Sequence, residues 1–521
     1  MRGGFGGPAL IPTSNLSHLL LQTARRFPDR PAIIWREQIW TWAQFAARVQ
    51  AAAGALATRG VRHGDRVLLH ARNSNAVLET MFASWMLGAV WVPTNFRLTP
   101  PEVAYLAKSS GAAVHIFDPA YPDHQAAAKA ENPVCRLEIL VGAEWDALAA
   151  ERAPMTRAAD VAHDHPAWFF YTSGTTGRPK AGVLTHGQME YVVCNHLCDL
   201  MPDTTEHDVS LVVAPLSHGA GIHALPQVAR GAATVLLSGE RLDCEQAWQL
   251  VERHRVTNMF TVPTILTMLV RHDAVDRYGH SSLRYVIYAG SPMYRADQKF
   301  ALGKLGPVLV QYFGMGEVTG NITVLPPSLH SLDDAEMPVG SCGFPRTGME
   351  VTIMDADGNH LPTGVTGEIC VRGPGVFAGY HNNPAATEAA TRFGWFHTGD
   401  LGHLDARGFV FITGRASDMY ISGGSNVYPR EIEEVLLTCA GVMEACVVGL
   451  PHERWGESGV AVLVSDGVTG VDEAQVFIHL EGRLAKYKWP TRVVFWPELP
   501  KSGYGKVTKR EVKRLLQEEN G

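Results

Sequence analysis

The chain has 521 residues, of which 46% are hydrophobic and 19% are charged, and its formal net charge is -7. This composition supplies sizeable cores for about two or three domains and excludes a disordered chain. No Lys/Arg cluster is long enough for a nucleic-acid footprint, so we expect no nucleic-acid partner. Eight irregularly spaced cysteines favour reduced thiols and a cytoplasmic protein. No stretch approaches the roughly 20 apolar residues of a membrane span.

Short apolar runs alternate with longer helical patterns along most of the chain. Residues 66–70, 113–117 and 209–214 have the character of buried strands, whereas residues 42–57 carry apolar side chains at helical spacing. Alternation over this length predicts an α/β fold with open, mixed or largely parallel sheets. In such folds, ligands bind at the carboxyl ends of the strands.

Beyond about residue 339 the sequence becomes rich in strand patterns. Residues 351–354 and 368–371, with a turn at 355–358, predict a hairpin, and residues 408–413 predict a further strand. A short polar segment, 414–418, then interrupts the pattern. We therefore expect a β-rich subdomain at about 339–414.

After the polar segment the pattern starts again. Residues 429–437 and 509–519 predict helices, and residues 460–464 predict a strand. We expect a large N-terminal domain at 1–414 and a small α+β C-terminal domain at 419–521. The residues between them, 415–418, form the connection.

The most informative segment is Tyr171-Thr-Ser-Gly-Thr-Thr-Gly-Arg-Pro-Lys180, which follows a short apolar run. Glycines allow several backbone amides to face one anion, hydroxyls add donors, and a lysine adds charge. The spacing is not that of a P-loop, because Arg178 and Pro179 separate the last glycine from the lysine. The loop predicts a phosphate site of another kind. Its candidate ligands are Thr172, Ser173, Gly174, Thr175, Thr176, Gly177 and Lys180.

This loop resembles the phosphate loop of the adenylate-forming superfamily, which includes acyl- and aryl-CoA ligases, peptide-synthetase adenylation domains and beetle luciferases. The segment 311–317 resembles the family's Tyr-Gly-x-Thr-Glu element, in which the glutamate helps to hold Mg²⁺ and an aromatic ring stacks on adenine. A triphosphate needs a hard cation with carboxylate ligands. Glu317 is therefore the expected Mg²⁺ ligand, with Thr175 as a further candidate. The other expected ATP contacts are Gly290, Ser291, Gln311, Tyr312, Phe313, Gly314 and Met315.

Two departures from the family pattern stand out. Ala181 follows the loop lysine where the family usually has glycine. Gly316 stands where the family has Thr or Ser, so a hydroxyl that would face the α-phosphate is missing. We expect less donor strength at that point, or a water in its place.

The resemblance continues toward the C-terminus. Asp400 matches the Thr-Gly-Asp carboxylate that accepts both ribose hydroxyls, and Arg415 is expected to reach the ribose or the phosphates. Asp418 matches the hinge residue between the two domains. Lys506 matches the catalytic lysine that binds the carboxylate and phosphate oxygens, and Lys501 is its neighbour without that role.

The resemblance implies a two-step reaction of a small-molecule carboxylic acid. ATP first converts the acid to acyl-AMP with loss of pyrophosphate, and the thiol of coenzyme A then releases AMP and takes the acyl group. Gly424, Trp455 and Tyr487 are the candidates for coenzyme A contacts. The alternatives are transfer to a carrier protein, adenylation without coenzyme A, or a non-catalytic nucleotide-binding relative.

His218 resembles the family's histidine at the mouth of the acyl pocket. Segment 215–222 contains no carboxylate for an α-ammonium group, which argues against amino acid substrates. Small residues suggest a roomy apolar pocket, and fatty, aryl and arylpropenoic acids all remain open. A homodimer is also left open. The expected pocket residues are His218, Gly221, Ile222, Ala289, Gly290, Gly314 and Ile322.

Overall fold

The structure is a computed structural model that describes residues 14–172, 178–239, 241–291, 293–337, 340–422, 424–501 and 507–519. Ser173, Gly174, Thr175, Thr176, Gly177 and Lys506, which are candidate site residues, therefore lie outside the described residues. No helix among the described residues is both long and apolar enough to cross a membrane.

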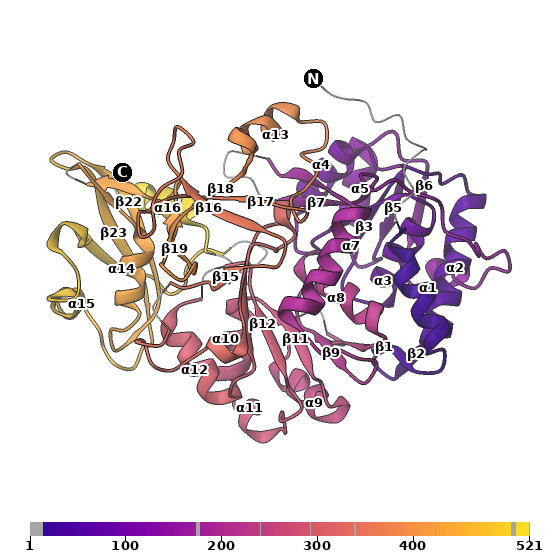
Figure 1. Cartoon of the computed structure of the whole chain (residues 1–521), viewed down its shortest axis with the longest axis horizontal. Coiled ribbons are helices and arrows are strands. Elements are labelled where there is room, and N and C mark those ends of the chain that lie inside the picture. The colour runs from indigo at the N-terminus through magenta and orange to yellow at the C-terminus, as the bar shows by residue number, and fades with distance from the viewer. Residues whose placement is uncertain are drawn as a thin grey trace.

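One sheet of six strands lies in the N-terminal part of the chain (Figure 1). Its strands are β3 (Arg66–His70), β4 (Val90–Thr94), β5 (Val114–Phe117), β6 (Leu137–Leu140), β7 (Pro166–Thr172) and β8 (Lys180–Thr185). Their order is β6-β5-β3-β4-β7-β8, and only the pair β7 and β8 is antiparallel. Strand β4 is buried along its whole length, which explains the apolar run from Val90 to Pro93.

A second sheet has nine strands in the order β15-β14-β13-β12-β11-β9-β10-β1-β2. These strands are β1 (Pro31–Trp35), β2 (Gln38–Thr41), β9 (Val209–Val212), β10 (Ala233–Leu236), β11 (Asn258–Thr261), β12 (Tyr285–Tyr288), β13 (Leu309–Phe313), β14 (Thr323–Leu325) and β15 (Phe344–Pro345). The strands from β1 to β13 along this order pair in parallel, and the outer strands pair antiparallel.

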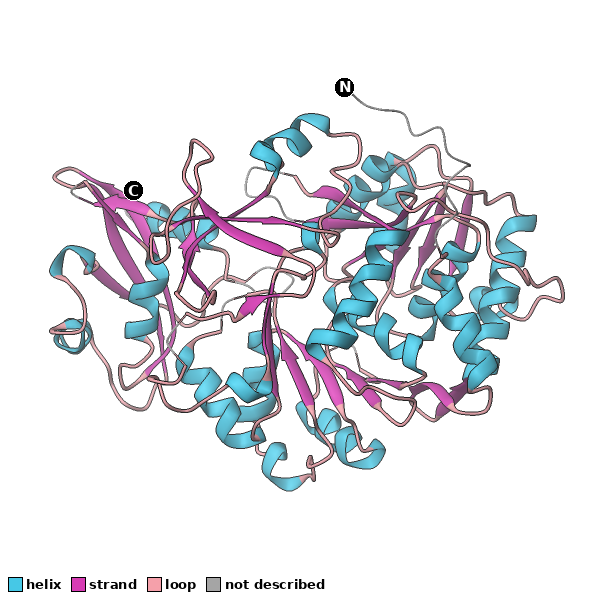
Figure 2. Cartoon of the chain, viewed as in Figure 1, coloured by secondary structure: helices cyan, strands magenta, loops and turns pink. Residues whose placement is uncertain are grey.

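Helices pack on both faces of these two sheets, and the helices at 75–86, 186–195 and 219–230 lie between the sheets (Figure 2). The largest apolar core contains Trp85, Trp91 and Trp168 of the first sheet's layer together with Val212 and Ile287 of the second sheet. The α-helices are α1 (Ser17–Arg26), α2 (Trp42–Thr58), α3 (Asn75–Met86), α4 (Pro100–Ser110), α5 (Pro122–Glu131), α6 (Ala143–Leu148), α7 (His186–Asn195), α8 (Gly219–Arg230), α9 (Cys244–His254), α10 (Pro263–Arg271), α11 (Ala274–Arg277) and α12 (Arg295–Leu305). Shorter turns of helix are η1 (His196–Leu200), η2 (Gly316–Val318) and η3 (Pro327–Leu329).

The β-rich part forms an antiparallel sheet of four strands in the order β16-β17-β18-β19. Its elements are β16 (Glu350–Met354), β17 (Gly367–Arg372), α13 (Pro384–Ala390), η4 (Arg392–Gly394), β18 (Phe396–Leu404) and β19 (Val410–Arg415). The expected pair of strands at 351–354 and 368–371 is present as β16 and β17.

The C-terminal part has its own sheet in the order β21-β20-β23-β22, with β24 beside β23. Its elements are β20 (Tyr420–Ser422), β21 (Ser425–Val427), α14 (Pro429–Leu436), β22 (Val442–His452), β23 (Gly456–Ser465), α15 (Glu473–Leu480), η5 (Lys486–Lys488), β24 (Arg492–Phe495) and α16 (Lys509–Glu519). The predicted α/β fold class, with parallel sheets, a β-rich part and a small α+β part, is confirmed.

Polar contacts join the C-terminal part to α12, which lies beside it in Figure 1. The Tyr294 hydroxyl donates to Glu433 Oε2 at 3.3 Å, and the Arg295 backbone N–H donates to Glu434 Oε2 at 3.2 Å. Burial raises the pKa of the Tyr294 hydroxyl and of the Glu434 carboxyl. Contacts of this polar kind suit a docking surface that separates more readily than an apolar core.

Candidate active site

Glu317 lies where β7, η2 and residue 380 meet. Its side chain is buried, and its Oε1 accepts hydrogen bonds from Thr172 Oγ1 at 2.7 Å and from the Tyr380 hydroxyl at 2.9 Å. Thr172 ends β7 and Lys180 begins β8, where the two are paired across the strands. Lys180 Nζ lies 5.2 Å from the centre of the Tyr380 ring. The structure therefore brings three of the expected nucleotide residues to one place.

The sequence analysis did not identify Tyr380. Burial and the Glu317 carboxylate raise the pKa of its hydroxyl, so this group stays protonated and donates its hydrogen bond. Its chain neighbours also join the loop before α13 to β8 of the first sheet, because the Val183 N–H donates to the Gly379 carbonyl. No phosphate-loop motif contains this tyrosine, since its role depends only on the crossing of distant segments.

Phe170 explains the missing hydroxyl at Gly316. A Cβ placed on Gly316 would lie 2.6 Å from Phe170 Cδ1 and 2.7 Å from Thr172 Cγ2, both too close for a real contact. The Phe170 ring also packs edge-on against the His218 ring, with 5.1 Å between centroids. The aromatic ring thus occupies the volume that a Thr or Ser side chain would need.

Asp400 and Arg415 are cross-strand partners on β18 and β19. Arg415 Nε lies 2.9 Å from Asp400 Oδ1, and the aspartate is only 5% exposed whereas the arginine side chain is 45% exposed. The Asp400 N–H donates to Thr398 Oγ1, which itself donates to the Ile369 carbonyl. These bonds fix the Thr-Gly-Asp turn before any ligand binds.

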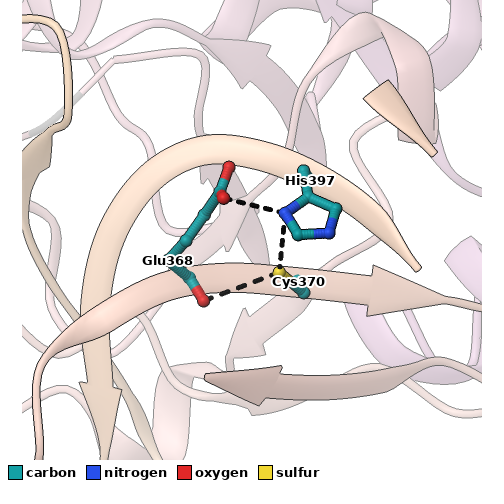
Figure 3. Close-up of side chains that lie close together, drawn as sticks. All are labelled: Glu368, Cys370 and His397. Carbon is teal, nitrogen blue, oxygen red and sulfur yellow. Dashed lines mark hydrogen bonds and ion pairs between the residues drawn. The ribbon is translucent and has the colours of Figure 1, made fainter. Parts of the chain in front are cut away.

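Glu368, which the sequence analysis placed only on a strand, supports this turn. Its Oε1 accepts the Gly399 N–H at 3.0 Å, and its Oε2 lies 2.8 Å from His397 Nδ1 (Figure 3). The Cys370 sulfur lies 3.4 Å from the same nitrogen, and Arg392 Nη2 lies 3.6 Å from Glu368 Oε2. Burial and Glu368 raise the pKa of the Cys370 thiol to about 12. We interpret the cluster as a hydrogen-bonded support for Asp400.

His218 precedes the first residue of α8, and its Nδ1 lies 2.9 Å from Ser217 Oγ. Two glycines at the start of this helix permit close packing. A Cβ on Gly219 would lie 2.5 Å from the Phe260 ring, and one on Gly221 would lie 2.1 Å from the Leu216 carbonyl oxygen. These glycines are required by packing.

The remaining expected pocket residues lie at strand ends and in turns around the same core. Ile222, Ala289 and Ile322 are buried, and Gly290 has a φ of +86° directly after β12. A Cβ on Gly314 would lie 2.4 Å from the Gly320 backbone, so two chain segments meet there.

The aromatic pair on β13 faces two directions. Tyr312 is 8% exposed and packs in the core against Phe260, at 6.0 Å between centroids, whereas Phe313 is half-buried. Gln311 accepts a hydrogen bond from the Tyr288 hydroxyl at 3.2 Å. Ser291 and Met315 are half-buried in the turns that follow β12 and β13.

The C-terminal candidates are more exposed. Asp418 lies in the turn between β19 and β20, and Gly424 has a φ of +82° between β20 and β21. Trp455 is 42% exposed with the Arg454 guanidinium 4.6 Å from its ring, and Tyr487 is 52% exposed. Exposed rings of this kind are available to stack on a ligand.

The residues near Glu317 fit the needs of a magnesium nucleotide. Mg²⁺ prefers carboxylate and hydroxyl oxygens, and Glu317 and Thr172 place such oxygens 2.7 Å apart. Lys180 adds a positive charge beside them. Thr175, the second candidate ligand, lies outside the described residues.

Known proteins resemble this chain along nearly its whole length. The AMP-binding enzyme family model matches residues 20–381, and the model of the AMP-binding enzyme C-terminal domain matches residues 431–506. Feruloyl-CoA synthase of Amycolatopsis sp is 37% identical over 498 residues, which cover 95% of this chain and 97% of that protein. Indoleacetate–CoA ligase of Aromatoleum aromaticum is 34% identical over 504 residues, covering 94% and 96%.

A solved structure gives the same result. ATP-bound MatB from Rhodopseudomonas palustris has a TM-score of 0.88 and 30% identity, covering 97% of this chain and 100% of that chain. The apo form of the same protein has a TM-score of 0.79.

The chain therefore belongs to the AMP-binding enzyme family of adenylate-forming enzymes. It is an AMP-forming acid–CoA ligase that uses ATP, Mg²⁺ and coenzyme A. The enzyme activates a small-molecule carboxylic acid as acyl-AMP and transfers the acyl group to the thiol of coenzyme A.

Proposed function

We propose that the acid is aromatic, either an aryl or an arylpropenoic acid. The observation that carries this proposal is the set of rings around the expected acyl pocket. Phe170 packs on His218, Phe260 lies against Gly219, and Tyr312 packs on Phe260. Aromatic walls favour an aromatic ligand through offset and edge-on contacts. The names of the two relatives above, a feruloyl-CoA synthase and an indoleacetate–CoA ligase, support the same class.

The first half-reaction brings two anions together, so its main requirement is electrostatic. Bound Mg²⁺ supplies charge neutralisation at the phosphates. We assign its binding to Glu317. Thr172 contacts Glu317, and Thr175 follows Thr172 in the chain. Lys180 offsets charge at the departing pyrophosphate, and Lys506 contacts the carboxylate and the α-phosphate. Asp400 accepts the ribose hydroxyls, and Arg415 Nε donates to Oδ1 of the same carboxylate. Preorganised charges of this kind usually lower the barrier more than any other effect.

We further propose that the C-terminal domain, residues 419–521, moves between the two half-reactions about a hinge at 415–418. Asp418 lies in a turn between two strands, where backbone angles change with little loss of packing. The polar contacts of Glu433 and Glu434 with α12 suit a surface that separates. The higher TM-score with ATP-bound than with apo MatB also supports more than one arrangement of these parts in the family. Rotation would withdraw Lys506 and admit the thiol past Gly424.

The test is mass spectrometry of coenzyme A products across benzoates, cinnamates and fatty acids. We expect thioesters of aromatic acids, with AMP release that depends on coenzyme A. Products from fatty acids alone would contradict the aromatic assignment. AMP release that ignores coenzyme A would instead favour a carrier protein as the acceptor.

Lys506→Ala tests the lysine and the movement together. We expect pyrophosphate exchange to fall by about 10²- to 10³-fold, whereas thioester formation from supplied acyl-AMP stays close to that of the wild type. Lys501→Ala is the matched control, because Lys501 lies in the same segment but pairs with Glu444 at 2.8 Å. An equal loss in both half-reactions would refute the assigned role.

A homodimer and a cytoplasmic location stay predictions from the sequence. Sedimentation equilibrium over a range of protein concentrations tests the first, and fractionation of the source cells tests the second.

A further inference from the structure

Arg346, directly after β15, is a fully buried arginine whose hydrogen bonds are incomplete. Its side chain is 0% exposed, and Nε and Nη1 have no hydrogen-bond partner among the residues that the structure describes. The nearest carboxylate oxygen, Asp199 Oδ2, is 3.7 Å from Nε. Unpaired donors of a buried charged group are costly, so each one calls for a specific explanation, such as a ligand that completes the hydrogen bonds.

The polar neighbours of Arg346 already take part in other hydrogen bonds. Asp199 already accepts hydrogen bonds from Asn195, from the Thr347 N–H and from Thr347 Oγ1. His196 Nδ1 lies 3.3 Å from Arg346 Nη2 but also 3.0 Å from the Val192 carbonyl. Because Nδ1 must accept in the first contact and donate in the second, one histidine tautomer satisfies only one of them.

A continuous line of side chains leads from the mouth of the expected acyl pocket to this arginine. His218 is followed by Gly219, which touches Phe260, and Phe260 stacks on Tyr312. The Tyr312 ring lies 6.2 Å from the His196 ring, which contacts Arg346. The backbone N–H of Arg346 also donates to the backbone carbonyl of Ile322, an expected pocket residue.

Close packing leaves no free space in the alternative direction, between α8 and the second sheet. The space between α8 and strands β9 to β11, lined by Ala220, His223, Ala224 and Phe260, has no room for a water-sized sphere. An acid that enters beside His218 cannot extend that way. The line of contacts described above runs the other way, past Phe260 toward Tyr312 and Arg346.

We propose that Arg346 binds a neutral hydrogen-bond acceptor at the end of the acid far from its carboxylate, so that the preferred substrates are hydroxylated aromatic acids. This proposal rests on the aromatic acid pocket proposed above. Asn321, the residue before Ile322, is 0% exposed, and its side-chain nitrogen and oxygen have no partner among the described residues. It offers a second pair of groups for a phenolic hydroxyl.

The charge balance favours a neutral group over a second carboxylate. Asp199 already lies near Arg346, so the two charges nearly cancel. A further carboxylate would leave a net negative charge in a site where burial also keeps His196 neutral by lowering its pKa well below the usual value. A dicarboxylic acid is therefore expected to be a poor substrate.

The test compares 4-hydroxycinnamate with cinnamate, and 4-hydroxybenzoate with benzoate, in pyrophosphate exchange by the full-length enzyme. We expect the wild type to favour the hydroxylated member of at least one pair by about 10-fold or more in kcat/KM. Arg346→Met should reduce this preference to less than about threefold with KM for ATP unchanged, and Arg346→Lys should restore part of it.

Arg48→Met is the matched control, because Arg48 is another arginine beside a carboxylate, that of the buried Glu79, but it lies on α2, away from the expected pocket. This variant should lose stability and keep the substrate preference. Equal use of both members of each pair by the wild type, a preference that survives in Arg346→Met, or a preference for a dicarboxylic acid would each overturn the proposal. Should Arg346→Met not fold, the wild-type ratios and Arg346→Lys decide.

These outcomes separate the two proposals. If no aromatic acid supports exchange, the aromatic substrate class is wrong. If aromatic acids support exchange without a preference for the hydroxyl, only the role of Arg346 is wrong.

Discussion

The nucleotide side and the expected acyl side of this enzyme differ in how they pair their buried charged groups. Near the nucleotide, Glu317 and Glu368 accept hydrogen bonds from the protein itself, and Asp400 pairs with Arg415. Beside Ile322, an expected pocket residue, Arg346 and Asn321 keep buried polar atoms without partners among the described residues. A site for one invariant ligand can be fixed in advance, whereas a site that selects among acids must leave bonds for the acid to make.

The strongest test of the nucleotide side is Glu317→Gln. We expect pyrophosphate exchange to fall by about 10²- to 10³-fold for every acid, because a carboxylate ligand of Mg²⁺ is lost. The Mg²⁺ concentration at half-maximal rate should rise as well. An effect that differs between acids, or an unchanged Mg²⁺ dependence, would contradict the role of Glu317 as a Mg²⁺ ligand that serves every acid alike.

His223 on α8 should make part of the stability of the expected acyl side depend on pH, and His223→Gln tests this. Burial lowers the pKa of His223 to about 4, so between pH 6.5 and pH 4 the unfolded chain binds a proton that the folded chain does not. Stability contributed by the neutral histidine is present above this window and is lost as the pH falls through it. The decline in unfolding free energy from pH 7 to pH 5 should be smaller by about 2 kcal/mol in the variant.

Urea unfolding at each pH measures this difference. His207→Gln is the control, because that histidine side chain is 73% exposed. An equal decline in unfolding free energy from pH 7 to pH 5 in His223→Gln and in the wild type would contradict the prediction.

Glu368→Ala tests whether the support of the ribose-binding turn matters. We expect KM for ATP to rise by about 10-fold, because the Gly399 N–H and His397 lose a partly buried acceptor. KM for the acid should stay unchanged. Glu350→Ala on the neighbouring strand β16 is the control, since that side chain is exposed and pairs with Arg372. Equal behaviour of the two variants would remove Glu368 from the site.

The smallest effect concerns the boundary between the two sides. Gly316→Thr should lower the unfolding free energy by about 1 kcal/mol, because its Cβ meets Phe170 and Thr172. Phe170→Ala in the same chain should remove the part of this conflict that is due to the ring and let the new hydroxyl act in pyrophosphate exchange. Additive effects of the two substitutions on stability would show that Phe170 does not compete for the space.

The sequence by itself determined the fold class, the positions of many elements and the order of the nucleotide motifs. Strand β3 and helix α16 have the predicted bounds, since strong apolar patterns set them locally. The 15-residue spacing from Asp400 to Arg415 is also a local property, because β18 and β19 are consecutive antiparallel strands.

Only the tertiary structure decided which distant side chains complete the site. Tyr380 reaches Glu317 across 63 residues of sequence, and Phe170 fills the space beside Gly316. Arg346 carries no motif, and its unpaired donors become evident only when His196, Asp199 and Tyr312 are folded around it. Burial and packing depend on residues far apart in the chain, so no local pattern specifies them.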